Sequence, residues 1–238
     1  MKEVQNRLTR LLADAVRADV VPEACPDWLR RPGRTECRAM WETVSVMYGA
    51  LTGLVLPEQA PRRERRSLDV LLAYEDGQRQ ILEVDEKQHF TGARALTLEH
   101  YPAGTELGFD AARWLARSRA LSGREPGGGF ARPKPPLFPG DGGRHRQRAF
   151  RDALADLLPS QHGWLPTLRV SDTEVTALDS APDAAASLRA LLHGRGVPAS
   201  HLHGGSSPTD PGRAGRGDAG QAARSLPRTW RRPARSAW

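Results

Sequence analysis

The chain has 238 residues, of which 39% are hydrophobic, and a formal net charge of +7. This length allows one sizeable domain with a tail, and the low hydrophobic fraction suggests that part of the chain does not fold. No run of about 18 apolar residues is present, which argues against a transmembrane helix, and the N-terminus lacks the apolar core of a secretion signal. Cys25 and Cys37 form neither a zinc-ligand pattern nor a disulfide framework, so we expect a cytoplasmic protein.

The positive charge is concentrated at the C-terminal end. Residues 195–238 contain eight arginines and two aspartates, and therefore six of the seven net positive charges. The same segment is rich in Gly, Pro and Ser, so it cannot bury enough apolar surface to offset an ordering entropy of ~1–2 kcal/mol per residue. We expect a single folded domain over residues 1–194 and a disordered tail over 195–238, whose arginines could hold a polyanion loosely.

Hydrophobic spacing predicts the remaining elements in chain order. Apolar residues recur at helical spacing over residues 4–20, and a second helix begins at Thr35, as N-cap, and runs towards Gly49 or Gly53. Two strands and a hairpin follow at about 68–74 and 80–88. The later elements are a helix at about 109–121, a flexible Gly/Pro-rich surface insertion at about 123–143, a helix at about 146–158, a strand at 165–170 and a short helix at 184–193.

The second strand contains ionisable side chains at alternate positions. Glu83, Asp85 and Lys87 share one face because side chains in a strand alternate, and Leu82 and Val84 between them face a core. Successive residues on one face lie ~6.6 Å apart, so the two carboxylates can converge on one cation. Two carboxylates ~4 Å apart repel by ~4 kcal/mol at an effective dielectric of about 20, so they need a counter-charge. The arrangement predicts a metal site.

The length of the hairpin loop decides whether Asp69 joins this site. A two-residue turn would place Asp69 opposite Val84, on the apolar side of the sheet. A three-residue loop over residues 75–77, with Gly77 in the left-handed conformation, would place it opposite Glu83, and directly opposed residues share a face at ~4.5–5.5 Å. We expect the three-residue loop, because it gathers the acids instead of burying one among apolar side chains.

The order of these features resembles a known family. The chain has in order a helix with an acidic residue near its start, a strand with an isolated Asp, a hairpin and the motif Glu-x-Asp-x-x-Gln-His-Phe over residues 83–90. This order resembles the restriction-endonuclease-like nucleases, which are marked by Asp…(Asp/Glu)-x-Lys. The motif is most similar to the Glu-x-Asp-x-x-Gln-His group, related to the very-short-patch repair endonucleases. The resemblance covers roughly residues 33–178 without the insertion. It implies an α/β core, with a central mixed β-sheet flanked by helices, and Mg²⁺-dependent phosphodiester hydrolysis in which Mn²⁺ may substitute for Mg²⁺.

The resemblance also implies roles for individual residues. Asp69 would be the isolated metal-ligating Asp, and Glu83 and Asp85 would be the further acidic metal ligands. Two assignments of the signature stay open: Asp85-x-Lys87, or Glu83-x-Asp85 with Lys87 or Gln88 completing the site from the following turn. The predicted catalytic set is therefore Asp69, Glu83, Asp85, Lys87 and Gln88.

The motif gives three further residues no definite role in catalysis. Glu36 or Glu42 would match an acidic residue on the first core helix of the family, and the motif does not choose between them. His89 is expected only to end the strand through backbone hydrogen bonds, and the other histidines form no cluster with zinc-ligand spacing.

These patterns predict an endonuclease acting on DNA. The arginines just before Asp69 would contact backbone phosphates (Arg62, Arg63, Arg65 and Arg66). Cleavage of both strands by one such site would require a homodimer. The alternatives are a catalytically inactive nucleic-acid-binding protein of the same fold and a small interaction protein whose acidic strand binds a basic partner.

Overall fold

The computed structural model describes residues 2–61 and 66–204. Its strands form a four-stranded mixed sheet in the order β1–β2–β3–β4, in which β1–β2 and β2–β3 are antiparallel and β3–β4 is parallel. The strand bounds are Ala18–Pro22 for β1, Val70–Tyr74 for β2, Arg79–Asp85 for β3 and Leu165–Ser171 for β4. The expected mixed sheet is therefore confirmed.

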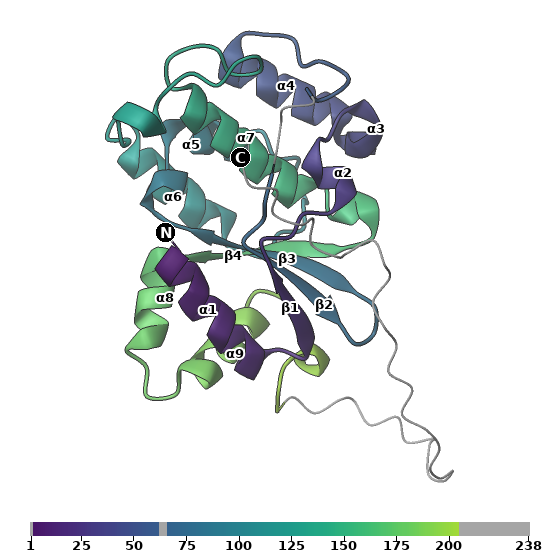
Figure 1. The fold of residues 1–238 in the computed structure, drawn as a ribbon, viewed down its shortest axis with the longest axis vertical. Helices are drawn as coiled ribbons and strands as arrows, with labels where there is room; N and C mark the ends of the chain where they lie inside the picture. Colours follow the sequence, from purple (N-terminus) through teal and green to yellow (C-terminus); the bar gives the residue numbers. More distant parts are fainter. Residues whose placement is uncertain (1, 62–65, 205–238) are drawn as a thin grey trace, which may run out of the picture. The chain divides into compact units, whose positions relative to one another are not determined.

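Helices cover both faces of the sheet (Figure 1). Helices α1, α8 and α9 lie on one face, and α4, α5, α6 and α7 lie on the other, with α2 and α3 beside α4. The helix bounds are α1 Lys2–Ala15, α2 Asp27–Arg30, α3 Arg34–Cys37, α4 Trp41–Thr52, α5 Gly92–Glu99, α6 Ala111–Leu121, α7 Gly143–Leu157, α8 Asp172–Asp179 and α9 Ala184–His193. This arrangement confirms an α/β architecture with a mixed sheet flanked by helices.

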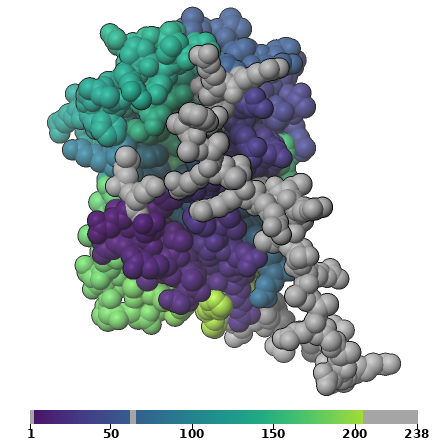
Figure 2. All heavy atoms as spheres, viewed as in Figure 1, coloured from purple at the N-terminus to yellow at the C-terminus, as the bar shows by residue number. Residues whose placement is uncertain are grey.

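Each face of the sheet has its own apolar core. On the side of α1, α8 and α9, alternate strand residues such as Leu72, Leu82 and Val84 are buried, whereas Ile81 packs with α4 and α7 on the other side. This alternation follows from the two-residue period of a strand. The space-filling view (Figure 2) shows purple side chains of the N-terminal segment in its lower part and teal side chains from the middle of the chain in its upper part.

The hairpin between β2 and β3 has the expected three-residue loop. The Tyr74 amide donates to the Gln78 carbonyl over 2.9 Å, and Gly77 adopts φ 87°. The strands pair Val70 with Leu82, so the residue before Val70 lies opposite the residue after Leu82. The predicted register is confirmed, and it directs the side chains of Asp69 and Glu83 to the same face.

The first predicted helix is too long. It ends at Ala15, and the residues that follow form the edge strand β1, in which Val20 pairs with Leu72. The apolar periodicity extended the predicted helix because Val16 and Val20 fit its apolar stripe. β-Branched residues also suit a strand when a partner strand is available. Tertiary pairing with β2 decided between the two.

The second predicted helix is interrupted. It divides into α3, a 3₁₀ turn and α4, because Arg38 takes a positive φ of 52°. Its N-cap is Gly33 and not Thr35: the Gly33 amide donates to the Glu36 carboxylate over 2.8 Å. The helix ends at Gly53 in the left-handed conformation, as one of the two expected ends.

The third correction concerns the end of β3. The strand stops at Asp85, and Lys87 lies in a 3₁₀ turn over Lys87–His89 with its side chain exposed. Beyond Leu82, β3 pairs only with β4, and that pairing ends where Asp85 meets Ser171. Ser171 then caps α8. No neighbouring strand among the described residues continues past this point, so the predicted strand over 80–88 is shorter than alternation suggests.

The glycine- and proline-rich segment at 123–143 is anchored and does not simply lie on the surface. Leu137 and Phe138 are buried among side chains of α4 and α7, and the Tyr48 hydroxyl donates to the Leu137 carbonyl over 2.6 Å. The expected surface insertion is therefore wrong at these residues, because two large apolar side chains gain more from burial than from exposure.

Helices α2, α5 and α8 were not predicted from the sequence, although α5 and α8 begin with side-chain caps. Thr91 caps α5 by accepting from the Arg94 amide, and Ser171 and Glu174 form a capping box at α8. Both caps follow the carboxyl end of a strand, β3 or β4. Side-chain acceptors at these helix starts satisfy amides that have no partner within the helix.

The folded part extends beyond residue 194. Val197 and Leu202 are buried in the core formed with α1 and α9, so the expected boundary at 194 is wrong. Residues 205–238, which contain most of the predicted disordered tail, lie outside the described residues. None of the helices in the described part of the chain combines the length and apolar character that a membrane crossing requires.

Replacing Gly77 should weaken the hairpin. We expect Gly77→Ala to lower the free energy of unfolding by about 1 kcal/mol, because a Cβ atom disfavours the left-handed conformation. Gly127→Ala is the matched control, since Gly127 has φ −81° and open space around it. Urea denaturation of both variants measures the difference, and equal stabilities would contradict the assigned loop conformation.

Candidate metal centre

A cavity of about 350 Å³ lies beside the carboxyl-terminal part of β3. Four acidic side chains line it, and four arginines line it as well. The acids are Asp69, Glu83, Glu86 and Asp152, and the arginines are Arg66, Arg144, Arg148 and Arg151. Acidic and basic groups therefore face one cavity, which a divalent cation and a phosphate group could share.

Asp69 and Glu83 form a close pair in this cavity. The Val84 amide donates to Asp69 Oδ2 over 2.8 Å, and the Glu83 side chain lies beside Asp69 on the same face of the sheet. Burial raises the pKa of Asp69, and burial together with the Asp69 charge raises the pKa of Glu83 well above its usual range. Two buried carboxyl groups this close cannot easily both be ionised, so they hold a proton or require a cation between them. Their oxygens are the ligands that Mg²⁺ prefers.

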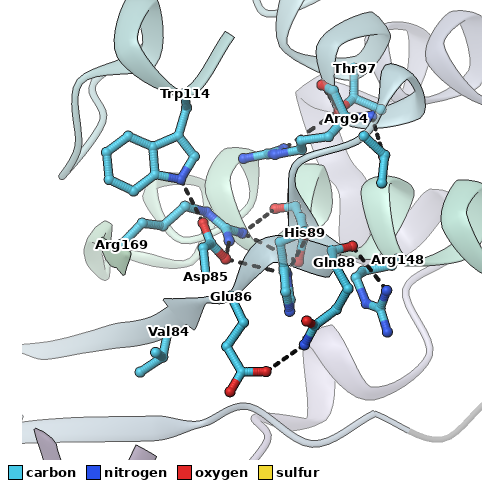
Figure 3. A network of polar contacts seen from close by, with 12 residues as sticks. Val84, Asp85, Glu86, Gln88, His89, Arg94, Thr97, Trp114, Arg148 and Arg169 are labelled. Atoms are coloured by element: carbon cyan, nitrogen blue, oxygen red, sulfur yellow. Dashed lines mark hydrogen bonds and ion pairs between the residues drawn. The ribbon is translucent and has the colours of Figure 1, made fainter. Parts of the chain in front are cut away.

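Asp85 lies on the same face of β3 but in a different environment (Figure 3). It is 1% exposed, and the Trp114 indole N–H donates to Oδ2 over 2.6 Å. Arg169 Nη1 donates to Oδ1 over 2.7 Å. Both oxygens of this predicted metal ligand are thus already bound to donors of the protein, one of them cationic.

His89 joins Asp85 to a third acid from a distant helix. Its Nδ1 lies 3.1 Å from Asp152 Oδ2 and 3.3 Å from Asp85 Oδ1. Burial alone would lower the pKa of His89, but the Asp152 carboxylate raises it above its usual value. Asp85, His89 and Asp152 each offer a ligand atom within 4.8 Å of the others, so this group could hold a metal ion.

A buried arginine organises these acids. Arg169 is 0% exposed in the middle of β4, and its Nε donates to Asp156 Oδ1 over 2.7 Å while its Nη2 donates to the Asp152 carbonyl over 3.0 Å. Asp156 also accepts from Arg94 over 2.6 Å. Burial would lower the pKa of Arg169, but the surrounding carboxylates raise it well above its usual value, so the guanidinium stays charged.

The sequence reading missed Asp152, Asp156, Arg169 and the role of His89. A signal was present in α7: its last turns are buried and apolar except for Asp152 and Asp156, which are one turn apart. Acids in such a stretch need a buried partner. The identity of that partner, a residue of β4, had no local signature.

Some of the other predicted site residues line the cavity and others do not. Gln88 lines the cavity, and its amide donates to the Glu86 side chain. Lys87 is exposed in the 3₁₀ turn and does not line the cavity, so it is not beside Asp85 as a strand residue would be. Arg66 lines the cavity, whereas Arg62, Arg63 and Arg65 lie outside the described residues.

Neither candidate acid of the first core helix reaches this site. The Glu36 side chain accepts from the Gly33 amide at the start of α3, and Glu42 is exposed on α4. Neither lines the cavity next to β3. Glu36 therefore has a local structural role in capping a short helix.

Comparison of the chain with protein-family models, with curated proteins and with solved structures found no match. The restriction-endonuclease-like core therefore stays a prediction from the motif. The chemistry of the site is argued below from the geometry of the cavity.

Removing Arg169 should strongly destabilise the protein. We expect Arg169→Met to lower the free energy of unfolding by about 3–5 kcal/mol, because Asp85 would remain buried without its arginine and Asp156 would keep only Arg94. Urea denaturation measures the change.

The matched control for this variant is Arg119→Ala. Arg119 pairs with Glu99 at the surface, where the arginine side chain is 61% exposed, so we expect a change within about 1 kcal/mol. Similar losses in the two variants would show that the buried network does not stabilise the fold.

Metal binding by variants can distinguish the two candidate metal sites. We expect Asp69→Asn and Glu83→Gln to weaken Mn²⁺ binding at least tenfold and His89→Ala to retain it, because Arg169 already forms an ion pair with Asp85, whereas burial and the Asp69 charge raise the pKa of Glu83. Titration of free Mn²⁺ by electron paramagnetic resonance measures this, with Glu99→Gln as a surface control. Loss of binding in His89→Ala alone would place the ion at Asp85, His89 and Asp152.

Proposed function

We propose that this protein is a divalent-metal-dependent endonuclease that hydrolyses phosphodiester bonds in DNA. The observation that supports it most is the cavity beside β3, in which a close pair of carboxyl groups faces four arginines. Carboxylate oxygens bind Mg²⁺, and guanidinium groups bind phosphate with fixed geometry. A site for a metal alone would not need the arginines, and a site for an anion alone would not need the acids.

The residues that line the cavity would have different roles in the reaction. Asp69 and Glu83 would hold Mg²⁺, or Mn²⁺ in its place, and the Val84 amide fixes the orientation of Asp69. When bound, the ion would lower the pKa of water and neutralise charge on the phosphoryl oxygens. The arginines would bind and orient the phosphodiester.

The position of His89 suits proton transfer. Asp152 and Asp85 hold its Nδ1, which fixes the ring orientation, and the ring lines the cavity. Its other nitrogen, Nε2, would then be the atom at which a proton is accepted from water or donated to the leaving oxygen. Lys87, the residue that the family signature suggests for this region, lies outside the cavity.

The position of Lys87 also favours one alternative, a nucleic-acid-binding protein of the same fold that does not cleave. In that case the cavity would bind a phosphodiester and a cation without activating water. The exposed Lys87 and the neutralised Asp85 both support this alternative, since neither is available in the role that the family signature gives it.

Nicking of supercoiled plasmid in Mg²⁺ or Mn²⁺ tests the proposal. We expect cutting that EDTA abolishes, and a loss of at least 10- to 100-fold in Asp69→Asn and Glu83→Gln, since even outer-shell changes at metal sites have effects of about that size. Glu99→Gln, which alters a surface carboxylate, should cut like the wild type.

Each other outcome has a definite meaning. Metal-dependent cutting that survives both substitutions would refute the site. DNA retention without cutting in either metal would support the non-cleaving alternative. Absence of both cutting and retention would favour an interaction protein with a basic partner.

A further inference from the structure

We propose that one face of α7 is a phosphate track: Arg144, Arg148 and Arg151, with Arg66 also lining the cavity, bind consecutive phosphates of a DNA strand in a manner that depends on the bound divalent ion. This inference deepens the proposed function and rests on it for the identity of the polymer. The arginines expected from the sequence to bind nucleic acid lie before β2, and three of the four proposed here come from α7 instead.

The spacing of the three arginines matches a strand of DNA. They lie at positions i, i+4 and i+7 of α7, which places them on one face of a helix with 3.6 residues per turn, and all three line the cavity. At a rise of ~1.5 Å per residue, the stripe spans about 10 Å of helix axis. One strand of a duplex places a phosphate every ~3.4 Å along its axis, so the stripe is long enough for about three phosphates.

Two of these guanidinium groups are held in place by the protein. Arg148 Nη1 donates to the Gln88 carbonyl over 3.0 Å, and Arg144 Nη1 donates to Gln147 Oε1 over 3.0 Å. The Arg148 contact joins the stripe to the turn that follows β3, next to the proposed metal ligands. A guanidinium fixed through one nitrogen can present others to a phosphate with less loss of side-chain freedom.

Arg66 supplies a donor that needs a partner. Its Nη1 is buried and finds no hydrogen-bond acceptor among the described residues, although the side chain lines the cavity. Buried donors are almost always satisfied in native proteins, so an unmet one calls for an explanation. A phosphate oxygen in the cavity would satisfy it.

The charge of the cavity explains why the ion matters. The lining contains four arginines and four acids, so it is formally neutral when all four acids are ionised and His89 is neutral. A proton shared by Asp69 and Glu83 would leave the lining at +1, and a divalent cation in place of that proton brings it to +2. The bound ion therefore strengthens the attraction of the cavity for phosphate.

The kind of contact sets the specificity. Guanidinium groups along one helix face would bind phosphates, and such contacts fix register without reading bases. We therefore expect binding that is insensitive to sequence and weakened by salt, with a salt slope of about 0.9 for each phosphate bound.

Fluorescence anisotropy of a labelled duplex tests the track. Binding is measured in Ca²⁺ and in EDTA over a range of salt, with the wild type and the triple variant Arg144→Ala, Arg148→Ala, Arg151→Ala. We expect Ca²⁺ to tighten wild-type binding at least tenfold. The triple variant should bind at least tenfold more weakly in Ca²⁺, with its salt slope reduced by about 2 to 3 units.

Arg146→Ala is the matched control on the same helix. Arg146 does not line the cavity and donates to the Asp141 carbonyl over 2.6 Å, so its removal changes the net charge without touching the track. It should retain the wild-type slope. The single variants Arg144→Ala, Arg148→Ala and Arg151→Ala, each checked for folding by circular dichroism, keep the test decisive if the triple variant does not fold.

The outcomes separate this inference from the proposed endonuclease. A triple variant, or a set of folded single variants, that binds DNA with the affinity and slope of Arg146→Ala would overturn the track, even if the wild type nicks plasmid. Wild-type binding that Ca²⁺ leaves unchanged would also overturn it. Loss of binding in the variants without any nicking by the wild type would support the track and reject the endonuclease. Comparable ion-dependent binding of a labelled RNA duplex would support backbone recognition and correct the identity of the polymer.

Discussion

The buried ion-pair network around Arg169 is the constraint on which the site depends. A charged group loses several kcal/mol of hydration on burial, so Arg169 is tolerated only because carboxylates surround it. Asp85 comes from β3, and Asp152 and Asp156 come from α7, so one guanidinium ties the sheet to the helix that covers it. The same contact sets the distance between β3 and α7. The cavity lies next to them and is lined by residues of β3 and of α7.

The network also divides the acids near the end of β3 into two kinds. Asp85 is neutralised by Arg169, and the pKa of Asp152 is lowered because His89 and Arg169 outweigh its burial. Asp69 and Glu83 have raised pKa values, because burial dominates for both and the Asp69 charge adds to it for Glu83. Arg169 neutralises Asp85, whereas the pair of Asp69 and Glu83 is not fully neutralised by the protein. An external cation can therefore bind at this pair. That contrast, more than the number of acids, separates this cavity from an ordinary polar surface.

Prediction from local sequence succeeded where residues close in the sequence determine the local structure. Gly77 and a three-residue loop determined the register of the hairpin, and capping by Asp110 and Asp183 agrees with the expected starts of α6 and α9. Local rules failed where a distant segment competed. The end of the first predicted helix became β1 because β2 offers its edge, and Lys87 left the strand because β4 turns into α8 at Ser171. Neither partner can be identified from the residues that it redirects.

The sequence by itself determined that Asp69 and Glu83 would meet, because a strand has a period of two residues and the hairpin loop sets which residues face each other. It also indicated that Asp85 would share their face. Only the tertiary structure decided what each acid does there. Asp152, Arg169 and the arginines of α7 lie some 60 or more residues further along the chain, and their approach to β3 depends on how a helix and a parallel strand pack. Packing of that kind depends on the shape and charge of whole faces, which no local spacing records.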